Sequence, residues 1–281
     1  MIPVERGQAV GRGWTSATGF KPIGVTWHWT ATFNLTTCRR ILGGANALRK
    51  GSASAHFGVG RSVDEGVDQY VSIENRSYHA GAGQTLEQDG RPLRSRSFIG
   101  ARTTIGIETV NVGYARRGVP AGDDWIPALS PNGRQEMRIE PWTEPQIVMM
   151  IELGRMLVSA FPNIRPNDHH GHSDICPGRK VDPLGFPFAR VLSGIYECSI
   201  EDVWSPFVEA EGRQRALKLL GYDLGPWGVD GDWGRVSQAA LEDYQVDRGL
   251  AEDGFWTLGV SRSIYSDLKI ANKLRDLTNA S

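Results

Sequence analysis

The sequence predicts an α/β domain followed by a small helical domain. Segments that alternate apolar and polar residues, typical of strands, are interleaved with segments of helical periodicity in the first two thirds of the chain. Residues 197–206 form an acidic link that contains Ser and Pro, and the residues after it show only helical periodicity. We therefore expect a first domain at 1–196, a linker at 197–206 and a second domain at 207–281.

The composition is that of a globular protein with a hydrophobic core. The chain has 281 residues, of which 40% are hydrophobic and 22% charged, and its 31 Lys and Arg nearly balance its 32 Asp and Glu. Residues 1–200 carry 22 basic and 18 acidic residues, whereas residues 201–281 carry 9 and 14. Because this bias is small and no run of Lys or Arg occurs, we expect no nucleic-acid partner.

Neither a membrane span nor a disulfide framework is predicted. No apolar run is long enough to cross a bilayer, and the first residues lack the apolar stretch of a signal peptide, so we expect synthesis in the cytoplasm without membrane insertion. The cysteines are Cys38, Cys176 and Cys198, an odd number without framework spacing. All six histidines lie between residues 28 and 172, which places any histidine chemistry in the first domain.

The strands predicted in the first domain are 23–29, 54–60, 67–71 and 103–110. The second and third flank an Asp-Glu-Gly turn and are expected to form a hairpin. His28 lies near the end of the first strand, where it can face a cleft, although a buried, hydrogen-bonded histidine is an equally good interpretation. His56 lies within the second strand and is interpreted as structural.

Two helices are predicted in the first domain, at 36–50 and 143–161. Thr36 or Thr37 can cap the first helix, in which Cys38 is interpreted as a small buried side chain. Thr143 can cap the second helix, which has Pro145 in its first turn.

Two long segments of the first domain lack a regular pattern. Residues 84–101 are polar and are interpreted as a surface loop. Residues 111–140 are unusually long for an irregular segment inside a domain, and we interpret them as a substrate-contacting insertion or a mobile lid.

Residues 171–183 are the segment most suited to chemistry. They contain a histidine, a cysteine, a lysine and an aspartate, and their prolines and glycines predict a loop. A catalytic zinc needs three ligands from His, Asp, Glu or Cys, which His172 and Asp182 of this loop could supply with His28. Glu108 is an acid in an otherwise apolar strand and must be paired, bound to metal or catalytic if it is buried.

Taken in order, these features resemble the zinc-dependent N-acetylmuramoyl-L-alanine amidases, a family of phage lysins, cytoplasmic muropeptide amidases and peptidoglycan recognition proteins. The resemblance covers roughly residues 20–190. Six blocks carry it, at residues 25–32, 54–57, 78–81, 105–108, 142–146 and 171–183. It implies a central mixed β-sheet flanked by helices.

The resemblance also implies a role for each candidate residue. It implies a Zn²⁺ held by His28, His172 and Asp182, with Glu108 as the general base and Lys180 as the group that stabilises the oxyanion.

Other residues near these positions are expected to support the site. Thr30 and His79 are expected to contact substrate, or His79 to lie behind the ligands. Cys176 is an alternative zinc ligand, since thiolate binds zinc well, although the resemblance places a non-ligand there. His169 or His170 is a candidate for hydrogen bonding behind the ligands.

The second domain is predicted to contain helices at 213–220, 236–247 and 258–273, with Gly221 ending the first. An Asp-Gly turn followed by an aromatic residue occurs at 229–234 and again at 252–257. The glycine and acid positions do not match a calcium-binding EF-hand.

Over about residues 207–270 this part resembles the three-helix peptidoglycan-binding domain. In that domain Trp227 or Trp233 could stack on sugars, or each could equally fill the core.

Together these features imply a peptidoglycan hydrolase that cleaves the amide between N-acetylmuramic acid and L-alanine. We expect a phage-type endolysin that acts on the wall after its release, tethered by its second domain. The alternatives are a cytoplasmic wall-recycling amidase and a non-catalytic peptidoglycan recognition protein.

Overall fold

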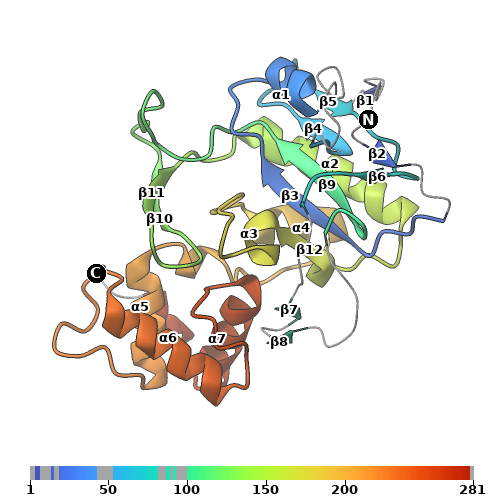
Figure 1. Cartoon of the computed structure of the whole chain (residues 1–281). Coiled ribbons are helices and arrows are strands. Elements are labelled where there is room, and N and C mark those ends of the chain that lie inside the picture. The colour runs from blue at the N-terminus through green and yellow to red at the C-terminus, as the bar shows by residue number, and fades with distance from the viewer. Residues whose placement is uncertain are drawn as a thin grey trace.

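The computed structural model describes residues 19–42, 53–81 and 100–278, together with the backbone of short strands at 4–6, 14–15, 87–88 and 91–92. A layered α/β part precedes a helical part in the chain, and the two lie against each other (Figure 1). In these ranges no helix combines the length and the apolar character that a membrane span requires.

Among the described residues, six strands form one mixed sheet. Its order is β1 (Val4–Arg6), β5 (Val67–Gln69), β4 (Phe57–Val59), β9 (Thr104–Thr109), β3 (Gly24–Trp29) and β12 (His169–Gly171). Neighbouring strands are parallel except β4 and β5, which form the predicted antiparallel hairpin. The predicted central mixed sheet is therefore confirmed, although β4 is shorter than expected and begins after His56.

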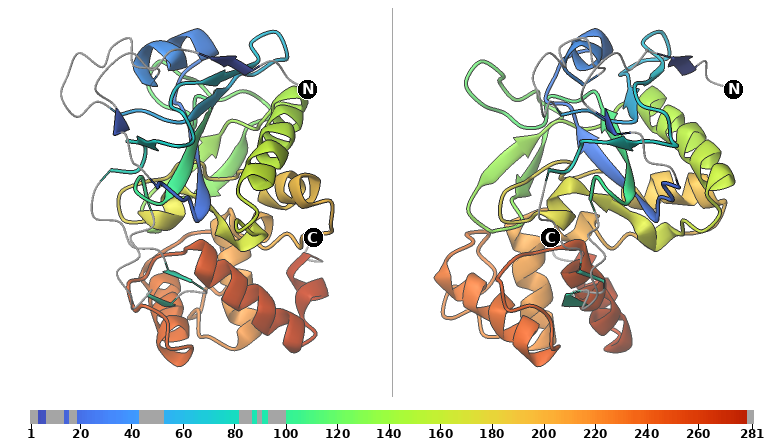
Figure 2. Two further views of the ribbon diagram at one scale, coloured as in Figure 1. Left: turned by 90° about the vertical axis from the view of Figure 1, so that its right-hand side faces the viewer. Right: turned by 45° about the vertical axis from the view of Figure 1, so that its right-hand side comes forward.

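The two faces of the sheet have different roles. Trp27 and Trp29 belong to the hydrophobic core that contains α2 (Glu144–Ala160) and α4 (Phe188–Tyr196), and these helices lie together on one side of the sheet (Figure 2). Because side chains alternate along a strand, Thr26 and His28 of β3 face the other side. That face is the one available for a site.

The helix caps show one correct and one wrong prediction. In α2, Thr143 accepts from the Gln146 amide while the Gln146 side chain accepts from the Thr143 amide, which completes a capping box. The first helix, α1, spans Leu35–Leu42, and the Asn34 side chain accepts from the Thr37 amide in place of a threonine cap. Residues 43–50 of the predicted helix lie outside the described residues.

The segment 111–140 is partly regular, which corrects the prediction of an irregular segment. It contains an antiparallel hairpin of β10 (Ile126–Leu129) and β11 (Glu136–Ile139). Each strand has only four residues and β10 contains a proline, so neither gives a clear strand pattern, although Pro131-Asn132-Gly133 between them is a turn signal. In Figure 1 this hairpin reaches from the sheet toward the helical part.

The segments 84–101 and 171–183, both predicted as loops, contain short regular elements. Residues 84–101 lie largely outside the described residues, apart from the short pair β7 (Glu87–Gln88) and β8 (Arg91–Pro92). A second short pair joins β2 (Trp14–Thr15) to β6 (Arg76–Ser77). The loop of residues 171–183 begins at the end of β12 and contains a short helix, α3 (His172–Ile175), so only its later part is irregular.

The described C-terminal residues form α5 (Ala210–Leu220), α6 (Arg235–Asp247), α7 (Leu258–Ile270) and α8 (Leu274–Thr278). The first three confirm the predicted helices. Gly221 ends α5 with a φ of 97°, a conformation that favours glycine. A hydrophobic core separate from that of the sheet lies among these helices.

The repeated Asp-Gly turns are each held by a buried glutamine. The Gln214 side chain donates to the Asp230 carboxylate and accepts from the Gly231 amide, at 2.7 and 2.8 Å. Gln245 makes the same two bonds to Asp253 and Gly254, at 3.0 and 2.9 Å. The repeat therefore has a structural role: it fixes the turns that lead into α6 and α7.

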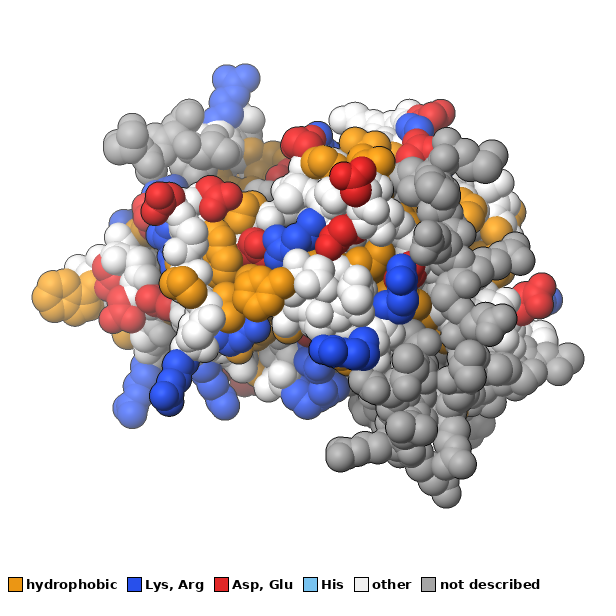
Figure 3. Space-filling model, turned by 90° about the horizontal axis from the view of Figure 1, so that it is seen from above, with side chains coloured by type: hydrophobic (Ala, Val, Ile, Leu, Met, Phe, Trp, Pro, Cys, Tyr) orange, Lys and Arg blue, Asp and Glu red, His pale blue; other side chains and the backbone are white. Residues whose placement is uncertain are grey.

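Seen from above, basic, acidic and hydrophobic side chains lie close together on the described surface (Figure 3). This mixture agrees with the near balance of charges in the sequence.

Candidate active site

Three predicted ligands converge at one edge of the sheet. His28 lies on β3, His172 follows the neighbouring parallel strand β12, and Asp182 lies in the loop after α3. The Asp182 Oδ2 atom is 3.0 Å from His28 Nδ1 and 3.1 Å from His172 Nδ1. All three residues are buried, and one ligand atom from each lies within 4.8 Å of the others.

The electrostatics of this cluster favour neutral imidazole beside an ionised carboxylate. Burial lowers the pKa of His28 to about 4, and the neighbouring His172 adds to this effect. Burial acts to raise the pKa of Asp182, but its contacts with His172 and His28 outweigh burial, and the pKa lies below the ordinary value. At neutral pH the cluster therefore offers nitrogen lone pairs and a negative oxygen.

His79 determines which nitrogen of His28 carries the proton. The Nε2 atom of His79 is 3.1 Å from the Thr104 carbonyl oxygen, so it must donate there. The Nδ1 atom of neutral His79 then accepts from Nε2–H of His28, 3.1 Å away. His28 is thereby left with its Nδ1 lone pair facing Asp182.

The sheet provides room for this histidine at Gly106 of β9. A Cβ atom built on Gly106 would lie 2.3 Å from the ring of His79. Only glycine allows His79 to lie this close to the strand and reach both Thr104 and His28.

The donor set fits a divalent metal ion. A lone pair and a carboxylate oxygen 3.0 Å apart repel each other unless a proton or cation lies between them, and the lowered pKa of His28 disfavours the proton. His172 Nε2 is also buried without a hydrogen-bond partner. Two imidazoles and one carboxylate are a donor set typical of catalytic zinc, which leaves a position open.

Cys176 does not join this group of ligand atoms in the described part of the chain. Its backbone amide donates to the His172 carbonyl, and its side chain is only partly buried.

Glu108 lies beside the ligands. On β9 it is paired in register with His28 of β3, so the two side chains share a face of the sheet. Burial raises the pKa of Glu108 well above its ordinary value, the Asp182 carboxylate adds to this, and Lys180 opposes it. A carboxylate of raised pKa close to the ligands is suited to accept a proton.

A cavity of about 740 Å³ opens next to this cluster. Its lining includes three predicted site residues that the structure brings together here, His79, His172 and Lys180. Among the described residues, the lining also contains Arg76, Arg102 and Arg179 and no carboxylate. None of these arginines was among the predicted site residues: Arg76 and Arg102 lie outside the six blocks, and Arg179, within block 171–183, was given no role.

The remaining histidines lie outside the ligand cluster. His56 Nδ1 accepts from the Gly106 amide and the Ser77 hydroxyl, and its Nε2 donates to the Asn75 carbonyl, which agrees with its structural interpretation. His169 accepts from Trp27 Nε1 on the core side of the sheet. The histidine that contacts a ligand is His79, and no such bond is seen from His169 or His170 in the part of the chain that the structure describes.

The other predicted substrate-binding residues lie apart from the cavity. Thr30 follows β3, and its hydroxyl is 2.7 Å from that of Thr32. Trp227, in the turn between α5 and α6, is 82% exposed. Trp233 is half-buried against the C-terminal core and donates to the Gln238 side chain, which matches the alternative interpretation of a core residue.

Two family models match the chain. The model of N-acetylmuramoyl-L-alanine amidase matches residues 18–185, more than half of the chain, and that of a putative peptidoglycan binding domain matches residues 213–260. A curated relative is 1,6-anhydro-N-acetylmuramyl-L-alanine amidase AmpD of Haemophilus influenzae, 26% identical over 130 residues. That match covers 46% of this chain and 52% of the relative, so the chain spans about half the length of AmpD.

Solved structures with a similar fold include those of AmpDh3 and AmiD. AmpDh3 from Pseudomonas aeruginosa, in complex with anhydromuramic pentapeptide, is 21% identical with a TM-score of 0.47, covering 92% of this chain and 96% of that one. The amidase AmiD from E. coli, in complex with anhydro-N-acetylmuramic acid-L-Ala-D-gamma-Glu-L-Lys, is 17% identical with a TM-score of 0.47, covering 92% and 94%.

Proposed function

Because the chain belongs to the N-acetylmuramoyl-L-alanine amidase family, we propose that it hydrolyses the amide bond between N-acetylmuramic acid and L-alanine in peptidoglycan, with zinc as its cofactor. The observation that carries this proposal is the convergence of His28, His172 and Asp182 beside Glu108. A recognition protein without activity would need neither a complete ligand set nor a buried carboxylate of raised pKa next to it.

The residues of the site divide the work of hydrolysis. A zinc ion held by His28, His172 and Asp182 would polarise the scissile carbonyl and lower the pKa of water. Glu108 accepts a proton from the attacking water and returns it to the leaving amine of L-alanine. The Lys180 ammonium lines the cavity next to the ligand cluster and stabilises the negative charge that develops on the carbonyl oxygen. One such donor typically lowers the barrier by about 3 kcal/mol.

The charge of the cavity supports an acidic substrate. It is lined by Arg76, Arg102, Arg179 and Lys180, with no carboxylate from the part of the chain that the structure describes. Stem peptides of peptidoglycan carry free carboxylates, which arginine binds in a bidentate manner. We place the stem peptide in this cavity, where His79 is a further candidate contact. Thr30 lies apart from the cavity and is a candidate contact for another part of the substrate.

The C-terminal domain supports polymeric wall as the substrate. A soluble muropeptide needs no polymer-binding domain, whereas a tethered enzyme meets many bonds of the same polymer at high local concentration. The match of residues 213–260 to a putative peptidoglycan binding domain and the exposed Trp227 both favour this assignment. We therefore favour an endolysin-type enzyme that acts on the wall after release over a wall-recycling amidase.

Mass spectrometry of digested sacculi tests the reaction. We expect new L-alanine amino termini together with intact glycan strands, and the zinc content of the active protein should be near one ion per chain. Cleavage within the glycan, or no cleavage by zinc-loaded protein, would exclude the amidase reaction. Comparing rates on sacculi and on a soluble anhydromuramoyl tripeptide then separates wall hydrolysis from recycling.

A further inference from the structure

The C-terminal helices are docked on the first domain and are not merely joined to it. Trp204, in the segment predicted as a linker, stacks on Phe188 of α4 with ring centroids 4.8 Å apart. Ile200 and Val208 on either side also pack against the hydrophobic core of the sheet. A flexible tether would make no such contacts, so the linker is part of the folded structure.

A buried arginine joins α5 to the β10–β11 hairpin. The Arg213 side chain is 2% exposed and donates to the backbone carbonyls of Phe207, Leu129 and Ser130, at distances from 2.7 to 2.9 Å. Its guanidinium lies over the ring of Trp256, 5.2 Å from the centroid. Burial lowers the pKa of Arg213 to about 9, so it remains charged at neutral pH and is held by these carbonyls.

The turn before α7 contacts both the hairpin and the segment that carries two of the proposed metal ligands. The Trp256 amide donates to the Pro131 carbonyl at 2.7 Å. Phe255 lies against Gly178, where a Cβ atom would approach the phenyl ring to 3.2 Å. Gly178 lies in the loop between His172 and Asp182, so this contact falls on the ligand segment itself.

Asp174 makes the most direct link between the two parts. One carboxylate oxygen accepts from the Gly171 amide at 2.7 Å, and the other accepts from the Leu258 amide at 3.2 Å. Leu258 is the first residue of α7, where amide groups have no partner within the helix and carry partial positive charge. Asp174 thus connects the residue before His172 to the N-terminus of a helix in the other domain.

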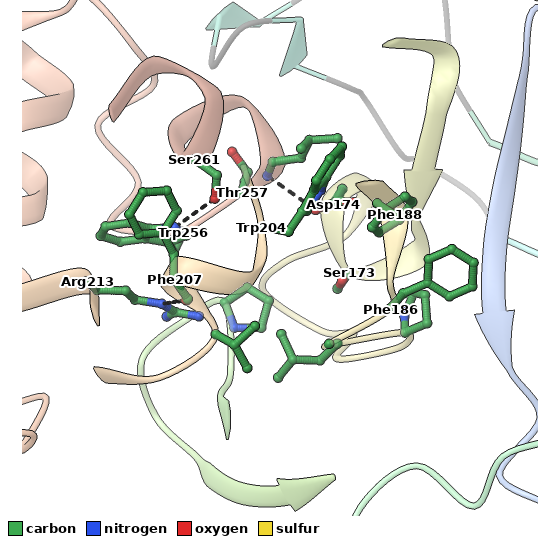
Figure 4. Close-up of a pocket in the computed structure, with 16 residues that line it drawn as sticks. Ser173, Asp174, Phe186, Phe188, Trp204, Phe207, Arg213, Trp256, Thr257 and Ser261 are labelled. Atoms are coloured by element: carbon green, nitrogen blue, oxygen red, sulfur yellow. Dashed lines mark hydrogen bonds between the residues drawn. The ribbon is translucent and has the colours of Figure 1, made fainter. Parts of the chain in front are cut away.

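The space around this link is filled by protein. Figure 4 shows Asp174 beside Thr257, with Trp256, Phe207 and Arg213 on the C-terminal side and Ser173 near Phe186 on the other. The cavity that remains is about 50 Å³, enough for water and too small for a sugar or peptide. The contact is therefore packing between domains and not a ligand site.

We propose that the C-terminal domain positions the active site: through the Leu258 amide and Asp174 it holds the segment His172–Asp182 so that both ligand residues stay together. The positioning residues are Asp174 and Leu258, neither of which lines the cavity in which we place the substrate. The consequence for catalysis rests on the proposed amidase function, whereas the ordering of the segment does not.

Two substitutions at one position isolate the critical hydrogen bond. Leu258→Pro removes the amide donor, and proline is well tolerated at the first position of a helix after an extended residue such as Thr257. Leu258→Ala is the matched control, because it also loses the leucine side chain but keeps the donor. Circular dichroism on both full-length variants reports whether the C-terminal helices form.

Hydrogen–deuterium exchange of residues 172–182 in the metal-free protein is the primary measurement. We expect exchange in Leu258→Pro to be about tenfold faster than in Leu258→Ala, with zinc binding about tenfold weaker in competition with a chelator. On a soluble muropeptide, kcat should fall more than KM changes. Equal exchange and equal zinc affinity in two folded variants would overturn the proposal. A wild-type protein that neither binds zinc nor cleaves would instead defeat the amidase function.

Discussion

His28 and Glu108 occupy paired positions on the adjacent parallel strands β3 and β9, so that their side chains share one face of the sheet. The strand register therefore places a proposed metal ligand next to the proposed general base, although 80 positions separate the two residues in the chain. Strand pairing holds this relationship whether or not substrate is present. The two residues should accordingly be separable by mutation, one acting on metal and the other on proton transfer.

Replacing Glu108 by glutamine should reduce kcat by about 10² to 10⁴ without loss of zinc, because the amide cannot accept the proton of water. The measurement is the rate of release of soluble stem peptide, with zinc determined by mass spectrometry. Glu144→Gln is the control, since Glu144 is exposed at the start of α2 and pairs with Arg190 there. Zinc-loaded Glu108→Gln with wild-type activity would remove Glu108 from the mechanism.

Replacing His79 by phenylalanine should weaken zinc binding by about 10- to 100-fold, because His28 loses the acceptor that fixes its proton on Nε2. His79→Asn offers a similar pair of hydrogen-bonding groups and should lose less affinity. Chelator competition measures both variants. If the His79→Phe variant binds zinc as tightly as the wild-type protein, the orientation of His28 does not depend on His79.

Substitutions at Asp182 and Cys176 distinguish the two candidates for the third ligand. Asp182→Ala should abolish zinc retention during dialysis, because the carboxylate contacts both histidines. Cys176→Ser should retain zinc, because Cys176 lies outside the cluster of ligand atoms formed by the described residues. The reverse pattern would move the third ligand to the cysteine.

The candidate ligand residues stand out in the sequence because their chemistry is unusual in its local context. A histidine at a strand end, an acid in an apolar strand and a His-to-Asp loop all appear in the sequence without tertiary information. The hydrogen bond from His28 to His79 was not predictable, because it depends on the strand register and on the space left by Gly106.

The contacts between the two domains could not be predicted from the sequence, for a similar reason. Arg213 looks like any basic residue on an amphipathic helix, yet it is buried by a hairpin whose first strand begins 87 positions earlier. The segment 197–206 has the composition of a linker, but Trp204 packs against the first domain. The composition of a segment indicates that it is polar, but it does not indicate which surface the segment packs against.

Acid should destabilise the metal-free protein through its buried histidines, and His56 allows this to be tested. Burial lowers the pKa of His56 from 6.5 to about 4. Below pH 6.5 His56 becomes protonated in the unfolded chain but stays neutral in the folded protein. The folded protein therefore loses stability between about pH 6.5 and pH 4, by up to about 1.4 kcal/mol per pH unit. The free energy of unfolding, measured with urea, should depend less steeply on pH in His56→Asn. The difference in slope should correspond to one fewer proton taken up on unfolding. Parallel curves for the two proteins would contradict this assignment.

Trp227 should contribute to wall binding without contributing to the chemistry. Its side chain is 82% exposed in a turn of the C-terminal domain, and an aromatic ring held in this way can stack on a sugar face. Loss of one such contact typically costs about 1 kcal/mol, so Trp227→Ala should bind sacculi about fivefold more weakly in a sedimentation assay while cleaving a soluble muropeptide at the wild-type rate. Ile270→Ala is a matched control, because Ile270 is equally exposed at the end of α7 but offers no ring. Equal wall binding by the two variants would show that this tryptophan does not contact the wall.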